Sequence, residues 1–163
     1  MELKYEITDS SCHTPIQATK GSAGLDLTAQ SFGTGRLSSK GVVVFKTGVK
    51  VQIPPGFFGA LYIRSSLAIK HDWKMANSVG VIDSDYRGEI KVAFKFVGCM
   101  FDQIRESRKL VGQRIAQLVI QPCVIPKLVR VDSLEETERG EGGFGSTDKE
   151  PIRTGPRFYG DYD

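Results

Sequence analysis

The segment VGVIDSDYRGEI carries two carboxylates, Asp83 and Asp85, next to an aromatic residue, Tyr86. On an extended strand the two carboxylates would share one face, whereas in a tight turn they would diverge. Gly88 favours the turn and Ile90 begins a return strand, so the segment predicts a hairpin. A carboxylate at such a turn can deprotonate water, and a tyrosine ring can pack against a sugar. A solvated turn explains the same residues, because Asp and Gly are common in turns.

A second group of polar residues has the chemistry of phosphate binding. Arg64 stands directly before Ser65 and Ser66, where a predicted strand ends and a short helix begins. Guanidinium, hydroxyl and helix N-terminal N–H groups all bind phosphate, although a serine can equally act as a plain N-cap. Asp26 and Gln117 are polar residues in apolar, strand-like surroundings, so each is either a satisfied structural group or a ligand contact.

A glycine-rich segment near the C-terminus, RGEGGFGST, is the third candidate. Its glycines match G-x-G-x-x-G, but no strand precedes them and no helix follows, which excludes a dinucleotide-binding turn. Backbone N–H groups of successive glycines can instead bind an anion, with Arg139, Ser146 and Thr147 as further donors. Phe144 could stack on a planar ligand. A disordered glycine tail is the alternative.

Composition narrows the function classes. The 163 residues include 22 Lys and Arg and 19 Asp and Glu, which gives a net charge of +3. This charge is too small for strong electrostatic binding of nucleic acid. The three cysteines form no C-x-x-C and only two histidines are present, which argues against a disulfide framework and a zinc site. We find no membrane-spanning run and no secretory leader, and we expect an intracellular protein of the cytoplasm or nucleus.

The elements that must position these residues are mostly strands. Residues 3–7 and 90–96 alternate apolar and polar side chains, and shorter β-rich runs recur about every ten residues, the last at 124–131. This spacing favours a sandwich, jelly roll or barrel. Helix is expected only around 66–70 and 102–110. After Leu134, glycine, proline and charge replace aliphatic residues, which predicts a mobile arm.

The order of the segments is more specific than any one of them. Five segments follow one another between residues 22 and 147: SAGLDLTA, YIRSSLA, NSVGVIDSDYRGEI, GQRIAQL and RGEGGFGST. This series resembles the five motifs of the homotrimeric dUTPase family. The resemblance implies an all-β, distorted jelly-roll barrel or sandwich with one short helix. It also implies hydrolysis of dUTP to dUMP and pyrophosphate with Mg²⁺, in a homotrimer whose sites lie between subunits.

The resemblance also assigns roles to the third segment. Asp83 matches the carboxylate that deprotonates the water attacking the α-phosphorus in line. Tyr86 matches the ring packed against deoxyribose, where a 2′-hydroxyl would clash. The uracil-reading element matches four residues: Asn77, Gly80, Val81 and Ile82.

The other motifs would handle the phosphates and the metal. Arg64, Ser65 and Ser66 match triphosphate contacts, and Arg64 would stabilise charge on the departing pyrophosphate. Gln117 matches a glutamine near the phosphates and the attacking water. Asp26 matches an aspartate that holds the water shell of a Mg²⁺ ion bound by the three phosphates, so the substrate would carry the metal in.

The fifth motif would form a lid over bound nucleotide. It corresponds to five residues: Arg139, Phe144, Gly145, Ser146 and Thr147. The expected organisation is a β domain over residues 1–134, a glycine-rich flap over 135–147 and a disordered tail over 148–163.

Four features depart from the family pattern. Ile63 and Gln113 stand where a proline and an acidic residue are usual, and both resemble viral members, which makes a viral or retroelement origin plausible. The stretch 98–111 is an extension without an assigned role. The aromatic residues of the tail 148–163 make it a candidate docking peptide for a protein partner, with a solvated tail as the alternative.

Two other functions fit parts of the sequence. A dCTP deaminase shares the fold, but the intact aspartate segment and terminal flap favour hydrolysis. A regulatory module could retain nucleotide binding and capture a partner protein, for which the extension and the tail are the only support.

Overall fold

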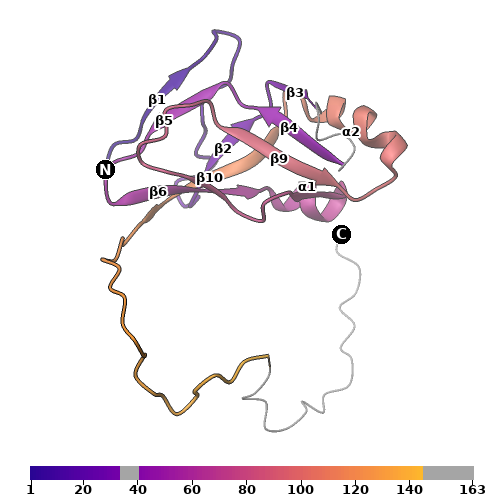
Figure 1. Cartoon of the computed structure of the whole chain (residues 1–163). Helices are drawn as coiled ribbons and strands as arrows, with labels where there is room; N and C mark the ends of the chain where they lie inside the picture. Colours follow the sequence, from indigo (N-terminus) through magenta and orange to yellow (C-terminus); the bar gives the residue numbers. More distant parts are fainter. Residues whose placement is uncertain (34–40, 145–163) are drawn as a thin grey trace. The chain divides into compact units, whose positions relative to one another are not determined.

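The structure is a computed structural model that describes residues 1–33 and 41–144. The chain divides into two compact units, Met1–Ile125 and Pro126–Asp163, and all described strands and helices belong to the first (Figure 1). Within the described residues, no helix is long and apolar enough to cross a membrane. The predicted boundaries at residues 134 and 147 stay predictions.

One four-stranded antiparallel sheet carries most of the candidate site. Its order is β2-β10-β6-β8, with strands β2 (Leu25–Thr28), β10 (Arg114–Pro122), β6 (Phe57–Ile63) and β8 (Gly80–Ile82). β10 lies between two partners, so Gln117 is opposite Asp26 on one side and opposite Tyr62 on the other. Residues directly opposite each other in an antiparallel pair project to the same face. Asp26 and Gln117 therefore share a face.

The second four-stranded sheet has the order β3-β4-β9-β7. Its strands are β3 (Ser31–Gly33), β4 (Val42–Lys46), β9 (Lys91–Phe96) and β7 (Trp73–Met75), and a separate antiparallel ladder joins β1 (Lys4–Ile7) to β5 (Val49–Gln52). The predicted strands at 3–7 and 90–96 correspond to β1 and β9. The all-β, jelly-roll class is confirmed, with open sheets.

The predicted hairpin at residues 79–90 is wrong as a strand pairing. β8 pairs with β6 in the first sheet, whereas β9 pairs with β4 and β7 in the second. The connection from Asp83 to Ile90 therefore crosses between two sheets. Alternation of apolar residues indicated β9 and β-rich composition indicated β8, but neither signal carries information about the partner of a strand.

Two short helices accompany the sheets. α1 (Ser65–Lys70) follows β6, and α2 (Gln103–Leu110) follows the 3₁₀ turn η2 (Met100–Asp102). The extension before β10 thus supplies a second helix beyond the one that the resemblance implied. The amide of Gln103 donates a hydrogen bond to the Gly41 carbonyl (2.8 Å), and Ser107 and Leu110 are buried, so α2 is anchored to the first unit.

The core lies between the two large sheets. Leu27, Leu61 and Leu118 from the first sheet belong to the same buried cluster as Phe45, Trp73 and Phe94 from the second. The ring centroids of Phe45 and Phe94 lie 5.7 Å apart, and Trp73 meets Phe45 edge to face at 5.9 Å. Inward-facing residues of both sheets therefore form one hydrophobic core.

The segment after β10 is apolar but unburied. Residues 124–131 form no strand, contrary to the prediction. Val124, Leu128 and Leu134 are each at least 85% exposed, and Ile125 and Val129 are exposed as well. The segment thus has strand-forming residues, but it pairs with no strand among the described residues.

Replacement of Phe94 by alanine should lower the free energy of unfolding by about 3–5 kcal/mol, because it opens a cavity among buried aromatic rings. Phe101→Ala is the matched control, since Phe101 is 98% exposed and its loss should change stability by less than about 0.5 kcal/mol. Denaturant unfolding at one protein concentration measures both. Equal effects would contradict this assignment of the core.

Candidate active site

A cavity of about 250 Å³ lies where β8 leads into the crossover loop. It is lined by six residues that the sequence assigned to the nucleoside and to water activation: Asn77, Gly80, Val81, Ile82, Asp83 and Tyr86. Apolar side chains of Leu61, Met75 and Ala93 complete its walls together with Glu89, Ile90 and Lys91. The structure therefore brings the residues of the third segment into one concave site.

The ring of Tyr86 is held in a defined place in this loop. Its hydroxyl donates a hydrogen bond to the Glu89 carbonyl (3.1 Å), and the Glu89 carboxylate accepts one from the Gly48 N–H (2.9 Å). A Cβ atom on residue 88 would lie only 2.5 Å from the ring carbon Cζ of Tyr86. Gly88 is therefore required for the ring to lie across the loop as it does.

The Asp83 carboxylate is exposed to solvent and can be reached by a water molecule. In residues 1–33 and 41–144, no side chain donates a hydrogen bond or forms an ion pair with it. Its backbone carbonyl accepts a hydrogen bond from the Tyr86 N–H (3.2 Å), which fixes the turn. Asp83 also lines a second cavity, of about 380 Å³, beside Phe57 and Phe58. A free carboxylate at the edge of a cavity can accept a proton from water.

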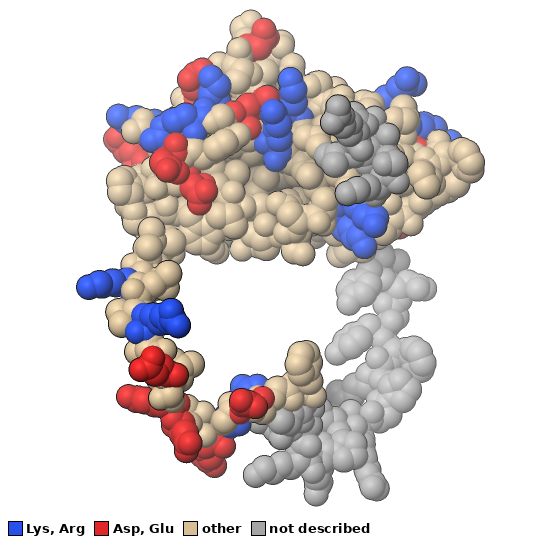
Figure 2. Space-filling view, in the orientation of Figure 1, with Lys and Arg blue, Asp and Glu red and all other residues tan. Residues whose placement is uncertain are grey.

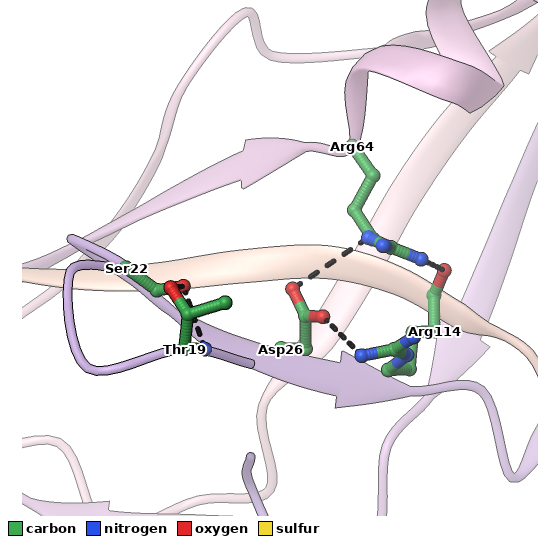
Figure 3. Close-up of polar contacts among 5 residues, drawn as sticks. All are labelled: Thr19, Ser22, Asp26, Arg64 and Arg114. Atoms are coloured by element: carbon green, nitrogen blue, oxygen red, sulfur yellow. Dashed lines mark hydrogen bonds and ion pairs between the residues drawn. The ribbon is translucent and has the colours of Figure 1, made fainter. Parts of the chain in front are cut away.

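A second polar cluster surrounds Asp26 on β2 (Figure 3). Its Oδ2 accepts a hydrogen bond from Arg114 Nη1 at 3.0 Å, and its Oδ1 lies 3.6 Å from Arg64 Nε. Arg64 Nη1 also donates to the Arg114 carbonyl (3.2 Å). Asp26 is only 5% exposed, so its charge is compensated inside the protein by two guanidinium groups.

Arg114 is a member of this cluster that the sequence reasoning missed. It stands within GQRIAQL, three residues before the glutamine that drew attention to that segment. The sequence does contain one signal for Arg114, which is that a charged side chain stands at the start of a strand predicted to be buried. Spacing along the chain does not reveal an ion pair to a residue on another strand.

The serines of the second segment lie beside the cluster. Ser65 and Ser66 are exposed in the first turn of α1, and Ser66 shares a cavity of about 300 Å³ with Arg64 and Arg114. The N-cap of α1 is Arg64, with no side-chain cap, so neither serine has the capping role offered as an alternative. Within residues 1–33 and 41–144 neither hydroxyl caps the helix, so both can meet a ligand. Across this cavity, a hydrogen bond from Lys109 (2.8 Å) lowers the pKa of Glu106.

The two clusters are far apart within one chain. Ile82 is opposite Gly59 on β6, so the next pair in that register sets Asp83 against Phe58. Arg64 follows the other end of β6, about 20 Å from Phe58 at about 3.3 Å per residue. Asp83 and Arg64 of a single chain therefore cannot both contact the α-phosphate of one nucleotide.

The residues present do not form a protein-held Mg²⁺ site. Both oxygens of Asp26 face arginines, and among the described residues no group of three or more His, Cys, Asp or Glu side chains comes together. Mg²⁺ bound to a protein commonly keeps several waters and uses substrate phosphates as ligands. The assignment of Asp26 to metal hydration stays a prediction.

The flap residues belong to the second unit and are only partly described. Arg139 Nε donates to the Gly142 carbonyl (2.8 Å), and Phe144 is exposed with a left-handed backbone, φ 49°. Gly145, Ser146 and Thr147 lie outside the described residues. The predicted lid therefore stays a prediction.

Surface charge is mixed on one face of the first unit. On the face of the first unit seen in Figure 2, Lys and Arg side chains alternate with Asp and Glu side chains. Several are paired, for example Lys50 with Glu6 at 2.8 Å.

Comparison with known proteins identifies the family. The dUTPase family model matches residues 10–148. A deoxyuridine 5′-triphosphate nucleotidohydrolase of Caldanaerobacter subterraneus is 37% identical over 89% of this chain and 96% of its own length. One from Beijerinckia indica is 44% identical over 82% of this chain and 81% of its own length.

Solved structures agree with these sequence matches. A point mutant of the dUTPase of staphylococcal phage 80α superposes with a TM-score of 0.72 at 28% identity, covering 89% of this chain and 98% of that one. The same phage enzyme with dUPNHPP gives a TM-score of 0.71 at 27% identity, covering 89% and 97%. Bacterial and phage proteins are both among the matches, so the predicted viral origin stays a prediction. With its family model covering most of the sequence and its relatives aligned along nearly their whole length, this chain belongs to the dUTPase family.

Proposed function

We propose that this protein hydrolyses dUTP to dUMP and pyrophosphate, with Asp83 as the general base. The observation that carries this proposal is the cavity of about 250 Å³ that gathers Asn77, Asp83 and Tyr86 at the end of β8. Relatives at 37–44% identity are named for the same reaction. Nothing in the described part of the chain favours dCTP deamination or a purely regulatory role over hydrolysis.

The cavity suits a deoxyuridine. Backbone groups of Gly80, Val81 and Ile82 and the amide of Asn77 can pair with the edge of a uracil ring, which has both donors and acceptors. Tyr86 would face the sugar, where its ring leaves no room for a 2′-hydroxyl. Gly88 allows that position of the ring.

The chemical step uses one water molecule. Asp83 accepts a proton from the water as its oxygen attacks the α-phosphorus, and the bond from that phosphorus to the α,β-bridging oxygen breaks. The electron pair of that bond leaves with pyrophosphate. Arg64, Ser65 and Ser66 would hold the phosphates, and Gln117 would help to place the water. Such a reaction depends chiefly on positioning and on compensation of charge.

The substrate is dUTP as its magnesium complex, with the ion bound by the phosphates. In the flap, Arg139, Phe144, Gly145, Ser146 and Thr147 would close over the nucleotide and exclude water. Hydrolysis in the compartment where DNA is made, the cytoplasm or nucleus, would limit uracil incorporation and supply dUMP.

We further infer that the protein works as a homotrimer with its sites between chains. The distance of about 20 Å along β6 separates Asp83 from Arg64, so a neighbouring copy must supply one of them. The exposed apolar side chains of residues 124–134 support the same inference, because burial against another chain would remove them from water.

Replacement of Asp83 by asparagine should lower kcat by roughly 10²–10⁴, the usual range for loss of a general base, with a modest change in nucleotide binding. Asp85→Asn is the matched control, since Asp85 is also exposed in the same loop but does not line the nucleoside cavity. A pyrophosphate-release assay measures both variants. Near wild-type turnover by the Asp83 variant would remove it from the role of base.

Gly88→Ala should reduce the preference for dUTP over UTP by roughly tenfold, because the added methyl group displaces the ring that excludes the ribose hydroxyl. Gly21→Ala is the control, since a Cβ there meets no atom within 4 Å. The ratio of kcat/KM for the two nucleotides is the measurement. An unchanged ratio would show that Tyr86 does not depend on Gly88 for its position.

Complementation tests whether the site is shared. Trimers of Asp83→Asn chains and trimers of Arg64→Gln chains should each be nearly inactive. Trimers reassembled from an equal mixture should recover about a quarter of wild-type activity, because one site in four then combines an intact Asp83 from one chain with an intact Arg64 from another. A mixture no more active than its components would place both residues in one chain's site.

A further inference from the structure

The backbone of Asp26 is fixed on both sides. It exchanges two hydrogen bonds with Ile16 (2.8 and 3.1 Å) and lies opposite Gln117 in the ladder with β10. The loop that leads to it is closed by Thr19 and Ser22, whose contact is drawn in Figure 3 (3.0 Å). The carboxylate therefore stands in a place set by the sheet, before any ligand arrives.

Two arginines converge on this carboxylate from other segments. Arg64 comes from the end of β6 and Arg114 from the start of β10, and Figure 3 shows their guanidinium groups on either side of Asp26. Two cations at such a short separation repel each other unless an anion lies between them. Asp26 supplies that anion, and the cluster retains a net charge of +1.

The guanidinium groups have donors left over. Each carries five N–H bonds, of which the contacts to Asp26 and to the Arg114 carbonyl use only some. The Arg64 and Arg114 side chains are 28% and 42% exposed, so the remaining donors can reach a ligand. Fixed guanidinium groups suit phosphate oxygens, which they can bind through two parallel bonds.

Lys109, which lines the cavity of about 300 Å³ with Arg64 and Arg114, and the nearby Arg105 on the same helix are both ion-paired. Lys109 donates to Glu106 at 2.8 Å, and Arg105 pairs with both Glu106 and Asp102. Among the ion-paired residues of this region, the surplus positive charge therefore belongs to Arg64 and Arg114.

We propose that Arg114 joins Arg64 in binding the triphosphate and that Asp26 positions both arginines. Asp26 then acts through its ion pairs and not through the hydration of Mg²⁺, since its carboxylate is directed at the two arginines and the residue is only 5% exposed. This inference rests on the proposed hydrolysis of dUTP, since it names the triphosphate as the anion. Arg114 is a binding residue, and Asp26 is a positioning residue that touches no substrate atom.

Calorimetric titration with sodium tripolyphosphate in EDTA tests phosphate binding by Arg64 and Arg114 alone, because neither a metal ion nor a nucleoside is present. Arg114→Gln and Asp26→Asn should each weaken binding by about tenfold or more relative to the wild-type protein, because charged hydrogen bonds are lost or misplaced. Glu6→Gln, which removes the carboxylate of an exposed ion pair elsewhere, should stay within about twofold. Arg114→Gln leaves the Asp26–Arg64 pair in place, so it tests the proposal even where Asp26→Asn does not fold.

Hydrolysis of dUTP at varied Mg²⁺ separates the two roles of Asp26. Positioning of the arginines predicts a raised KM with an unchanged Mg²⁺ requirement in Asp26→Asn. Wild-type affinity for tripolyphosphate in Arg114→Gln would overturn the proposal. Normal metal-free binding by Asp26→Asn, with activity restored by excess Mg²⁺, would overturn it too. A wild-type protein that binds tripolyphosphate through Arg114 but leaves dUTP intact would refute the proposed function. The inference that Arg114 binds phosphate would then still hold.

Discussion

Strand β10 hydrogen-bonds to β2 along one edge and to β6 along the other, and the phosphate side of the candidate site depends on this double ladder. It places Asp26 opposite Gln117 and brings Arg64, at the end of β6, next to the start of β10. Three sequence segments far apart in the chain thereby contribute to one cluster. A shift of one residue in either register would turn these side chains to the opposite face of the sheet.

The positions of the strands could be predicted from the sequence better than the pairing between strands. Period-two alternation marked β1 and β9, because successive side chains of a strand project to opposite faces of the sheet. The turn residue Gly88 implied a hairpin between β8 and β9, which pair in different sheets, since a turn residue does not identify the partners of the strands beside it. Residues 124–131 have strand composition without a strand, because a ladder needs a partner that the described chain does not offer.

For the site, residue type and order carried most of the information. The six residues predicted for the nucleoside and the water line one cavity, because four of them are consecutive and Asn77 and Tyr86 flank them closely. The role of Arg114, and that of Gly88 beyond the turn, escaped notice for physical reasons. The contribution of Arg114 is an ion pair across strands, and that of Gly88 is the space left for a ring, and neither produces a pattern in one sequence.

The separation of Asp83 from Arg64 links chemistry to assembly. On the proposed arrangement, one chain offers a nucleoside cavity and a phosphate cluster that cannot serve the same nucleotide, so a lone chain lacks the alignment on which phosphoryl transfer depends. Association then supplies positioning that the fold of one chain cannot. The exposed apolar side chains between Val124 and Leu134 provide surface whose burial would favour that association. The apolar segment that a single chain leaves exposed to water would thus help to complete the enzyme.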